Sequence, residues 1–110
     1  MIIVNLTPHE ITVVSASGAL VLPVSGKIAR VSTTRTPRPA IVTGEGHEIS
    51  VSTIVTGDVV GLPPPTEGTV FVVSAMVAGA VLRRDVFSPG DLVRDAGGVV
   101  IGCRGLTSYV

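Results

Sequence analysis

Residues 68–105 read GTVFVVSAMVAGAVLRRDVFSPGDLVRDAGGVVIGCRG. The continuous apolar run at 69–73 predicts a strand that is buried on both faces of a sheet. Ser74 is a natural N-cap for the small-residue segment 75–82, which predicts a helix of about two turns. The polar segment 91–95 and the apolar segment 99–104 flank the turn Ala96-Gly97-Gly98 and predict a hairpin over 91–104. This stretch therefore indicates a β-rich fold with one short helix.

The rest of the chain consists of short apolar or alternating runs that are separated by proline and glycine turns. The strands predicted there cover residues 1–6, 11–15, 19–22, 27–32, 40–43, 47–56 and 59–60. Together with the C-terminal strands they favour a mainly β fold, either a small β-sandwich or an open barrel, with one short helix. A chain of 110 residues has room for one core, so we expect a single β-rich domain over residues 1–110.

The composition favours a sheet and leaves two interpretations of the surface open. Hydrophobic residues make up 45% of the chain, but only three residues are aromatic and only 15% are charged. Such a low charge is expected either for a chain that buries a subunit interface or for one with a neutral surface rich in serine and threonine. Because uncovered sheet edges in a chain with few charges invite pairing, we expect a homo-oligomer.

The formal net charge is zero, so no overall field attracts DNA, RNA or a membrane surface. No apolar segment reaches the roughly 20 residues that span a bilayer. The first ten residues lack a basic region and a long apolar run, so we expect no signal peptide. The single cysteine, Cys103, lies in an apolar strand and is predicted to be a buried small hydrophobe. These features together predict a cytoplasmic protein.

Seven of the eight basic residues are arginines. The planar guanidinium group suits bidentate contact with phosphate or carboxylate, although a GC-rich genome would also favour arginine. Residues 32–39 read STTRTPRP, and we interpret them as a mobile loop facing a ligand. This loop would contribute Thr33, Thr34, Arg35 and Arg38. A solvated crossover loop and an extended edge with polyproline geometry are the alternatives.

Two further groups are candidates for ligand contact. Asn5, Thr7 and His9 follow the first strand, where binding groups often collect, but they also suit a turn that caps the strand. The second group is Arg83-Arg84-Asp85 with Arg94-Asp95, where the alternative is a structural Arg–Asp network that holds the helix exit against the hairpin. The sequence contains no Walker loop, GxSxG elbow, HExxH helix or CxxC pair. We therefore expect no catalytic residue, no metal site and no cofactor.

Several motifs resemble a family of small proteins from tailed phages, prophages and actinobacterial genomes. They are NLTPHEI at residues 5–11, ARVST at 29–33, GLPPPTEGTVFVVSAMVAGAV at 61–81, the following RRD, and PGDLVRDAGGVVIGCRGL at 89–106. The resemblance implies a setting rather than a chemistry: an accessory protein of the conflict between phage and bacterium, in the cytoplasm of the host. It assigns no role to any residue.

The leading hypothesis is a non-enzymatic binding protein that sequesters an anionic, nucleotide-like small molecule at a subunit junction. By analogy, it would be a phage sponge that evades bacterial immune signalling. The predicted ligand-binding residues are Asn5, Thr7, His9, Thr33, Thr34, Arg35, Arg38, Arg84 and Arg94. One alternative is a protein-interaction module that inhibits a host protein or serves as a minor phage component. A second is a phosphoester hydrolase that uses His9 and Glu10.

Overall fold

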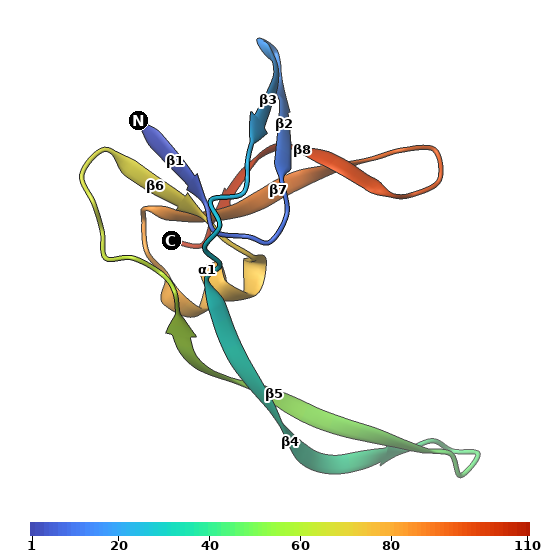
Figure 1. Ribbon diagram of the computed structural model, residues 1–110. Coiled ribbons are helices and arrows are strands. Elements are labelled where there is room, and N and C mark those ends of the chain that lie inside the picture. The colour runs from blue at the N-terminus through green and yellow to red at the C-terminus, as the bar shows by residue number, and fades with distance from the viewer.

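A computed structural model describes residues 1–110 and confirms a mainly β fold, with 56% of residues in strands and one short helix. Figure 1 shows the elements in chain order. They are β1 (Ile2–Asn5), β2 (Ile11–Ser15), β3 (Gly18–Leu22), β4 (Arg30–Val42), β5 (Glu48–Val60), β6 (Thr69–Val72), α1 (Ala75–Val81), β7 (Val86–Arg94) and β8 (Val100–Ser108).

Six strands form one curled sheet, a half-barrel with the order β1-β6-β7-β8-β2-β3. The β1–β6, β6–β7 and β2–β8 pairs are parallel, whereas β7–β8 and β2–β3 are antiparallel. The helix α1 connects the parallel strands β6 and β7, as parallel pairing requires a crossover. The remaining strands, β4 and β5, pair only with each other.

The core lies between α1 and the part of the sheet that contains β6. Its seven buried residues are Leu6, Ala29, Phe71, Val73, Val77, Ala78 and Val86. The predicted central strand is confirmed, because Phe71, Val72 and Val73 are each at most 3% exposed. The predicted helix is also confirmed: the Ser74 hydroxyl accepts a hydrogen bond from the backbone N–H of Val77 at 3.3 Å.

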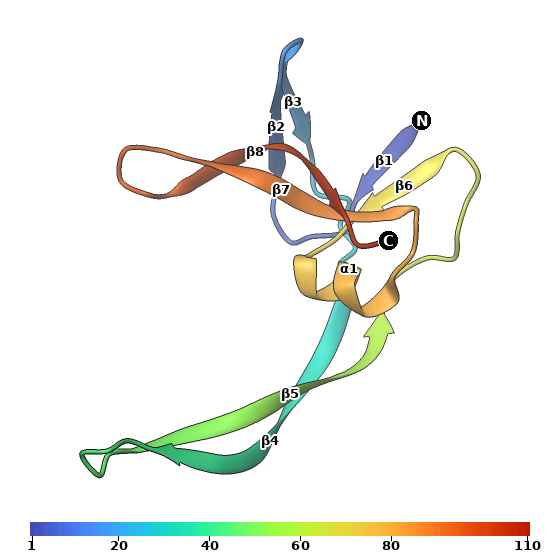
Figure 2. The same ribbon diagram turned by 180° about the vertical axis from the view of Figure 1, so that it is seen from behind.

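The strands β4 and β5 form a long twisted hairpin that projects from the body of the molecule, as both Figure 1 and Figure 2 show. We call this hairpin the arm. The prediction of a mobile loop at 32–39 is wrong, and the alternative of an extended edge is correct, because β4 runs unbroken through this segment. Pro37 lies opposite Ser52 in the ladder. Proline is tolerated there because each strand of a two-stranded ribbon is an edge.

The predicted turn at 57–58 is likewise wrong. β5 continues through residues 57 and 58. The pairing with β4 is irregular there, with a register shift between Val31 and Thr33. A Cβ atom at Gly57 would meet the Ser32 hydroxyl, so a larger residue there would require the Ser32 side chain to rotate away.

The C-terminal hairpin is longer than predicted. The expected turn at 88–90 is part of β7, with Pro89 opposite Leu106. Residues 106–108 form the end of β8 and pair with β7. This long pairing places the turn of the hairpin, after Arg94, at the end of a second projection (Figure 1).

The molecule is extended for its length. Its radius of gyration is 17.7 Å, whereas a compact domain of this size has about 13 Å. Its accessible surface is 7477 Å², against about 5,700 Å² for a compact monomer of this mass. Each chain therefore exposes an excess of roughly 1,800 Å², most visibly along the projecting hairpins.

Candidate functional site

The arm has two different faces, which follow from strand alternation and the observed register. On one face Thr34, Thr36 and Arg38 of β4 lie opposite Val55, Thr53 and Val51 of β5, and Ile41 lies opposite Ile49. On the other face Thr33, Arg35 and Pro37 lie opposite Thr56, Ile54 and Ser52. The first face thus has a row of aliphatic side chains on β5, whereas the second carries Ile54 among polar residues and, at the two ends of the ladder, the Val31–Val59 pair and Val42.

The apolar face of the arm has no cover. Ile41, Ile49 and Val55 are 58%, 50% and 48% exposed. An alternating pattern in a strand normally means that one face packs against something. A two-stranded ribbon in water is marginally stable without such packing. These three aliphatic side chains of the arm are therefore left uncovered by the single chain.

A hollow of about 760 Å³ opens where the arm joins the body. Its lining includes Val60 at the root of the arm and Met76 and Val77 of α1. Asp58 and Arg30 are charged residues at its wall. Most of the other lining residues are also small or apolar, so the hollow suits an apolar side chain better than a highly charged ligand.

The hollow and the apolar face form one continuous surface. Arg30, Val31 and Ser32 line the hollow, and by alternation Arg30 and Ser32 share their side of β4 with Thr34, Thr36 and Arg38. We call this surface the hollow-side face. It comprises Arg30, Ser32, Thr34, Thr36, Arg38 and Ile41 of β4, and Ile49, Val51, Thr53, Val55, Asp58 and Val60 of β5.

Asn5, Thr7 and His9 form a turn after β1 rather than an open binding site. Asn5 is 2% exposed, and its amide nitrogen donates to the carbonyl oxygens of His9 and Leu22 at 2.8 and 3.1 Å. Its side-chain oxygen accepts from the backbone N–H and hydroxyl of Thr7 at 2.9 and 2.7 Å. For Asn5 and Thr7 the alternative of a turn that caps the strand is therefore correct, because their polar atoms form the hydrogen bonds of that turn. The side chains of His9 and Glu10 are exposed and make no hydrogen bond.

The predicted set in segment 32–39 is split between the two faces of the arm. Thr34 and Arg38 lie on the hollow-side face, whereas Thr33 and Arg35 lie on the opposite one. Arg35 donates to the hydroxyl of Ser52 at 3.2 Å. Arg38 has no carboxylate within ion-pair distance.

Arg84 and Arg94 lie on other parts of the molecule. Arg84 is exposed in the connection between α1 and β7 and has no hydrogen-bonded partner. Arg94 closes the β7–β8 turn by donating to the carbonyl oxygen of Gly98 at 3.0 Å. The nine predicted ligand-binding residues thus do not gather around one hollow within a single chain.

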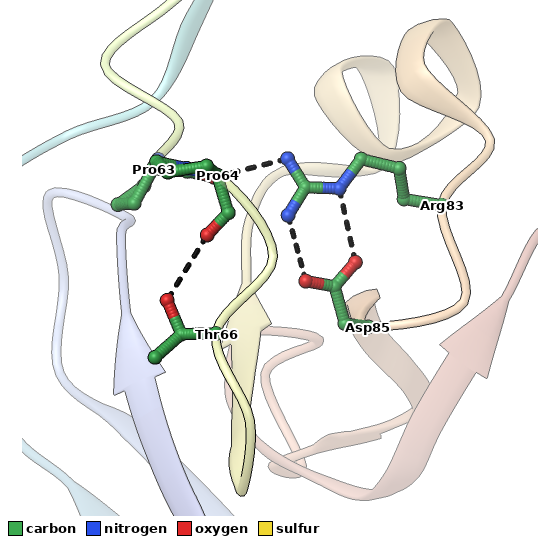
Figure 3. A network of polar contacts seen from close by, with 5 residues as sticks. All are labelled: Pro63, Pro64, Thr66, Arg83 and Asp85. Carbon is green, nitrogen blue, oxygen red and sulfur yellow. Dashed lines mark hydrogen bonds and ion pairs between the residues drawn. The ribbon is translucent and has the colours of Figure 1, made fainter.

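Arg83, which was not among the predicted ligand-binding residues, is the most highly connected arginine. Figure 3 shows its guanidinium group held between Asp85 and the carbonyl oxygen of Pro63. Two nitrogens donate to the two carboxylate oxygens at 3.0 and 2.6 Å, and a third donates to Pro63 at 3.0 Å. These hydrogen bonds hold the pKa of Asp85 below its usual value, and partial burial only partly opposes the shift. The arrangement joins the helix exit to the proline-rich segment before β6.

A second, smaller hollow of about 320 Å³ lies between the start of β2 and the strands β7 and β8. His9 and Glu10 are at its edge, and Cys103 contributes to its lining while being only 1% exposed. No group of three or more potential metal-ligating side chains occurs in the structure. The chain also forms no helix with the length and apolarity needed to cross a lipid bilayer.

The sequence interpretation missed the hollow-side face, although part of its signal was present. Residues 47–56 alternate as predicted, with Ile49, Val51 and Val55 on one side. The sequence interpretation did not predict that this strand pairs with residues 30–42 across the turn at 43–47. That pairing places the residues of β4 on the hollow-side face opposite those of β5. The contribution of Met76 depends on tertiary packing and has no local signal.

Comparisons with known proteins add no assignment: no protein-family model, no curated protein and no solved structure matches this chain.

Proposed function

We propose that this protein is a non-enzymatic assembly protein that binds another polypeptide through the hollow-side face of its arm. The observation that carries this proposal is the uncovered row of aliphatic side chains on the hollow-side face, which ends in a mainly apolar hollow. Exposed apolar surface of this kind is typical of protein-binding sites. A role as a minor structural component of a phage, or as an inhibitor docked on a host protein, agrees with such a surface.

A site-specific photocrosslinking experiment tests this function. A benzophenone amino acid replaces Val55 on the hollow-side face and, as the matched control, the neighbouring Ile54 on the opposite face. We expect adducts to a polypeptide, the same chain included, from position 55 and few from position 54. Mass spectrometry of the crosslinked peptides identifies what was captured. Absence of any polypeptide adduct from position 55 in the producing cells and in the purified protein would refute the proposal.

The sequestration of an anionic, nucleotide-like molecule at a subunit junction is a second candidate. It is supported by Arg30, Arg38 and Arg84, none of which has a carboxylate within ion-pair distance, so their guanidinium groups are free to bind phosphate. Assembly of several chains would be needed to bring such groups together. Native mass spectrometry with a panel of cyclic dinucleotides and ADP-ribose tests it. Bound ligand released unchanged supports sequestration, and no bound mass across the panel removes it.

A further inference from the structure

The hollow-side face carries three charged residues: Arg38 and Asp58, which have opposite signs and lie at separate positions along the arm, and Arg30, which lies at the root opposite Val60. Arg38 lies opposite Val51 toward the tip, and Asp58 lies at the root beside the hollow. Both are exposed, and neither has an ion-pair partner within the chain. Val51, which lies opposite Arg38, is seven positions from Asp58 on β5. The two charges are therefore separated by roughly 20–23 Å along the hairpin.

A second copy of the same chain satisfies both charges at once. If two arms lie antiparallel with their hollow-side faces in contact, Arg38 of each copy lies opposite Asp58 of the other. The two-fold axis then passes near the Thr34–Val55 pair. A residue on such an axis contacts its own counterpart, and these two uncharged side chains meet without electrostatic repulsion.

The same register places the tip of each arm over the root hollow of the other copy. Ile41 and Ile49, which form a pair near the tip, lie at the level of Val60 in the second copy. That residue lines the hollow together with Met76 and Val77 of α1. Two exposed isoleucines thus meet the apolar part of the hollow beside Arg30, and the same arrangement pairs Arg38 with Asp58.

The molecule as a whole exposes more surface than such a contact needs. Each chain exposes roughly 1,800 Å² more than a compact monomer. A stable interface needs about 800 Å² from each partner. We propose that two copies of this chain clasp their arms antiparallel across a two-fold axis near Val55, with Arg38 of each copy paired with Asp58 of the other. This inference rests on the proposed function and names its partner as a second copy of the chain.

Charge reversal tests the pairing. In R38E and D58R homodimers, each former ion pair becomes a like-charge pair, which costs several kcal/mol across an interface. We expect each single variant to raise the dimer Kd at least about tenfold at low salt. An equimolar mixture of R38E and D58R should form heterodimers, because Glu then meets Arg and Arg meets Asp at the two junctions. The double variant R38E/D58R should dimerise again for the same reason.

Native mass spectrometry measures all of these species, because the two single variants differ in mass. R35E is the matched control, since Arg35 lies on the opposite face of the same strand, and it should dimerise like the wild type. Circular dichroism verifies that each variant is folded.

Three results would overturn the clasp. They are a monomeric wild type at all concentrations, single variants that dimerise like the wild type, and a mixture without heterodimer enrichment. If position 55 still gives polypeptide adducts in these cases, only the clasp fails. If it gives none, the proposed function fails as well.

Discussion

Replacing Arg83 with methionine is expected to lower the free energy of unfolding by about 2 kcal/mol. Arg83 donates three hydrogen bonds, two to the Asp85 carboxylate and one to the carbonyl oxygen of Pro63. Its guanidinium carbon also lies 6.0 Å from the centre of the Phe71 ring. Methionine preserves most of the side-chain volume but removes every donor.

The magnitude follows from the environment of the pair. The side chains of Arg83 and Asp85 are only 24% and 21% exposed, so water replaces the lost contacts poorly. Hydrogen bonds to charged groups contribute about 1.5–3 kcal/mol, and the partial exposure places the expected loss near 2 kcal/mol. For a domain of this length, such a loss lowers the Tm by roughly 8 to 10 °C.

Thermal unfolding followed by circular dichroism, at several pH values, is the assay. Because the folded state lowers the pKa of Asp85, the contribution of this carboxylate is fully present above its unfolded pKa near 3.8. It is lost as the pH falls through the lower pKa of the folded state. The difference in Tm between the wild type and R83M should therefore be constant near neutral pH and become smaller in strong acid.

The neighbouring Arg84 provides the control, since it is exposed and has no polar partner. R84M should change the free energy of unfolding by less than about 0.5 kcal/mol. Equal Tm values for R83M and R84M, or an R83M effect that does not diminish in acid, would refute this account of the network.

Three other changes are predicted. Gly102→Ala should destabilise the sheet by about 1–3 kcal/mol in urea unfolding, because its Cβ atom would lie 2.8 Å from the carbonyl oxygen of Thr12 on β2. Asn5→Ala should cost about 3 kcal/mol in the same assay, because four hydrogen bonds of a buried side chain are lost. Cys103 should react slowly with a thiol reagent in the folded protein and rapidly in denaturant, because it is 1% exposed.

Each of these predictions has a control. Gly105→Ala should be nearly neutral, because a Cβ atom there meets no atom within 4 Å. His9→Ala should cost little, because only its backbone takes part in the turn. A neutral Gly102→Ala or Asn5→Ala, or equal thiol reactivity in both states, would contradict the packing described above.

Local patterns determined much of the fold. The mainly apolar run 69–73 predicted a buried strand, and Ser74 before a small-residue segment predicted the start of a helix, because both signals depend on neighbouring residues alone. The segments with an internal proline were misread. Pro37 and Pro89 lie within strands, which is possible because the missing N–H of a proline need not face a pairing strand.

The sequence by itself determined that this chain is a small β-rich protein with one short helix, an aliphatic core and few charges, since these properties follow from composition and short-range periodicity. The tertiary structure alone decided which strands pair. In that structure β4 and β5 pair only with each other and form the arm, and Arg35 and Arg38 lie on its opposite faces. Arg83 binds Asp85, and the hollow-side face ends at a hollow lined partly by α1. The physical reason is that register and face are set by contacts between residues far apart in the chain, and a shift of one residue would reverse every side chain of the arm.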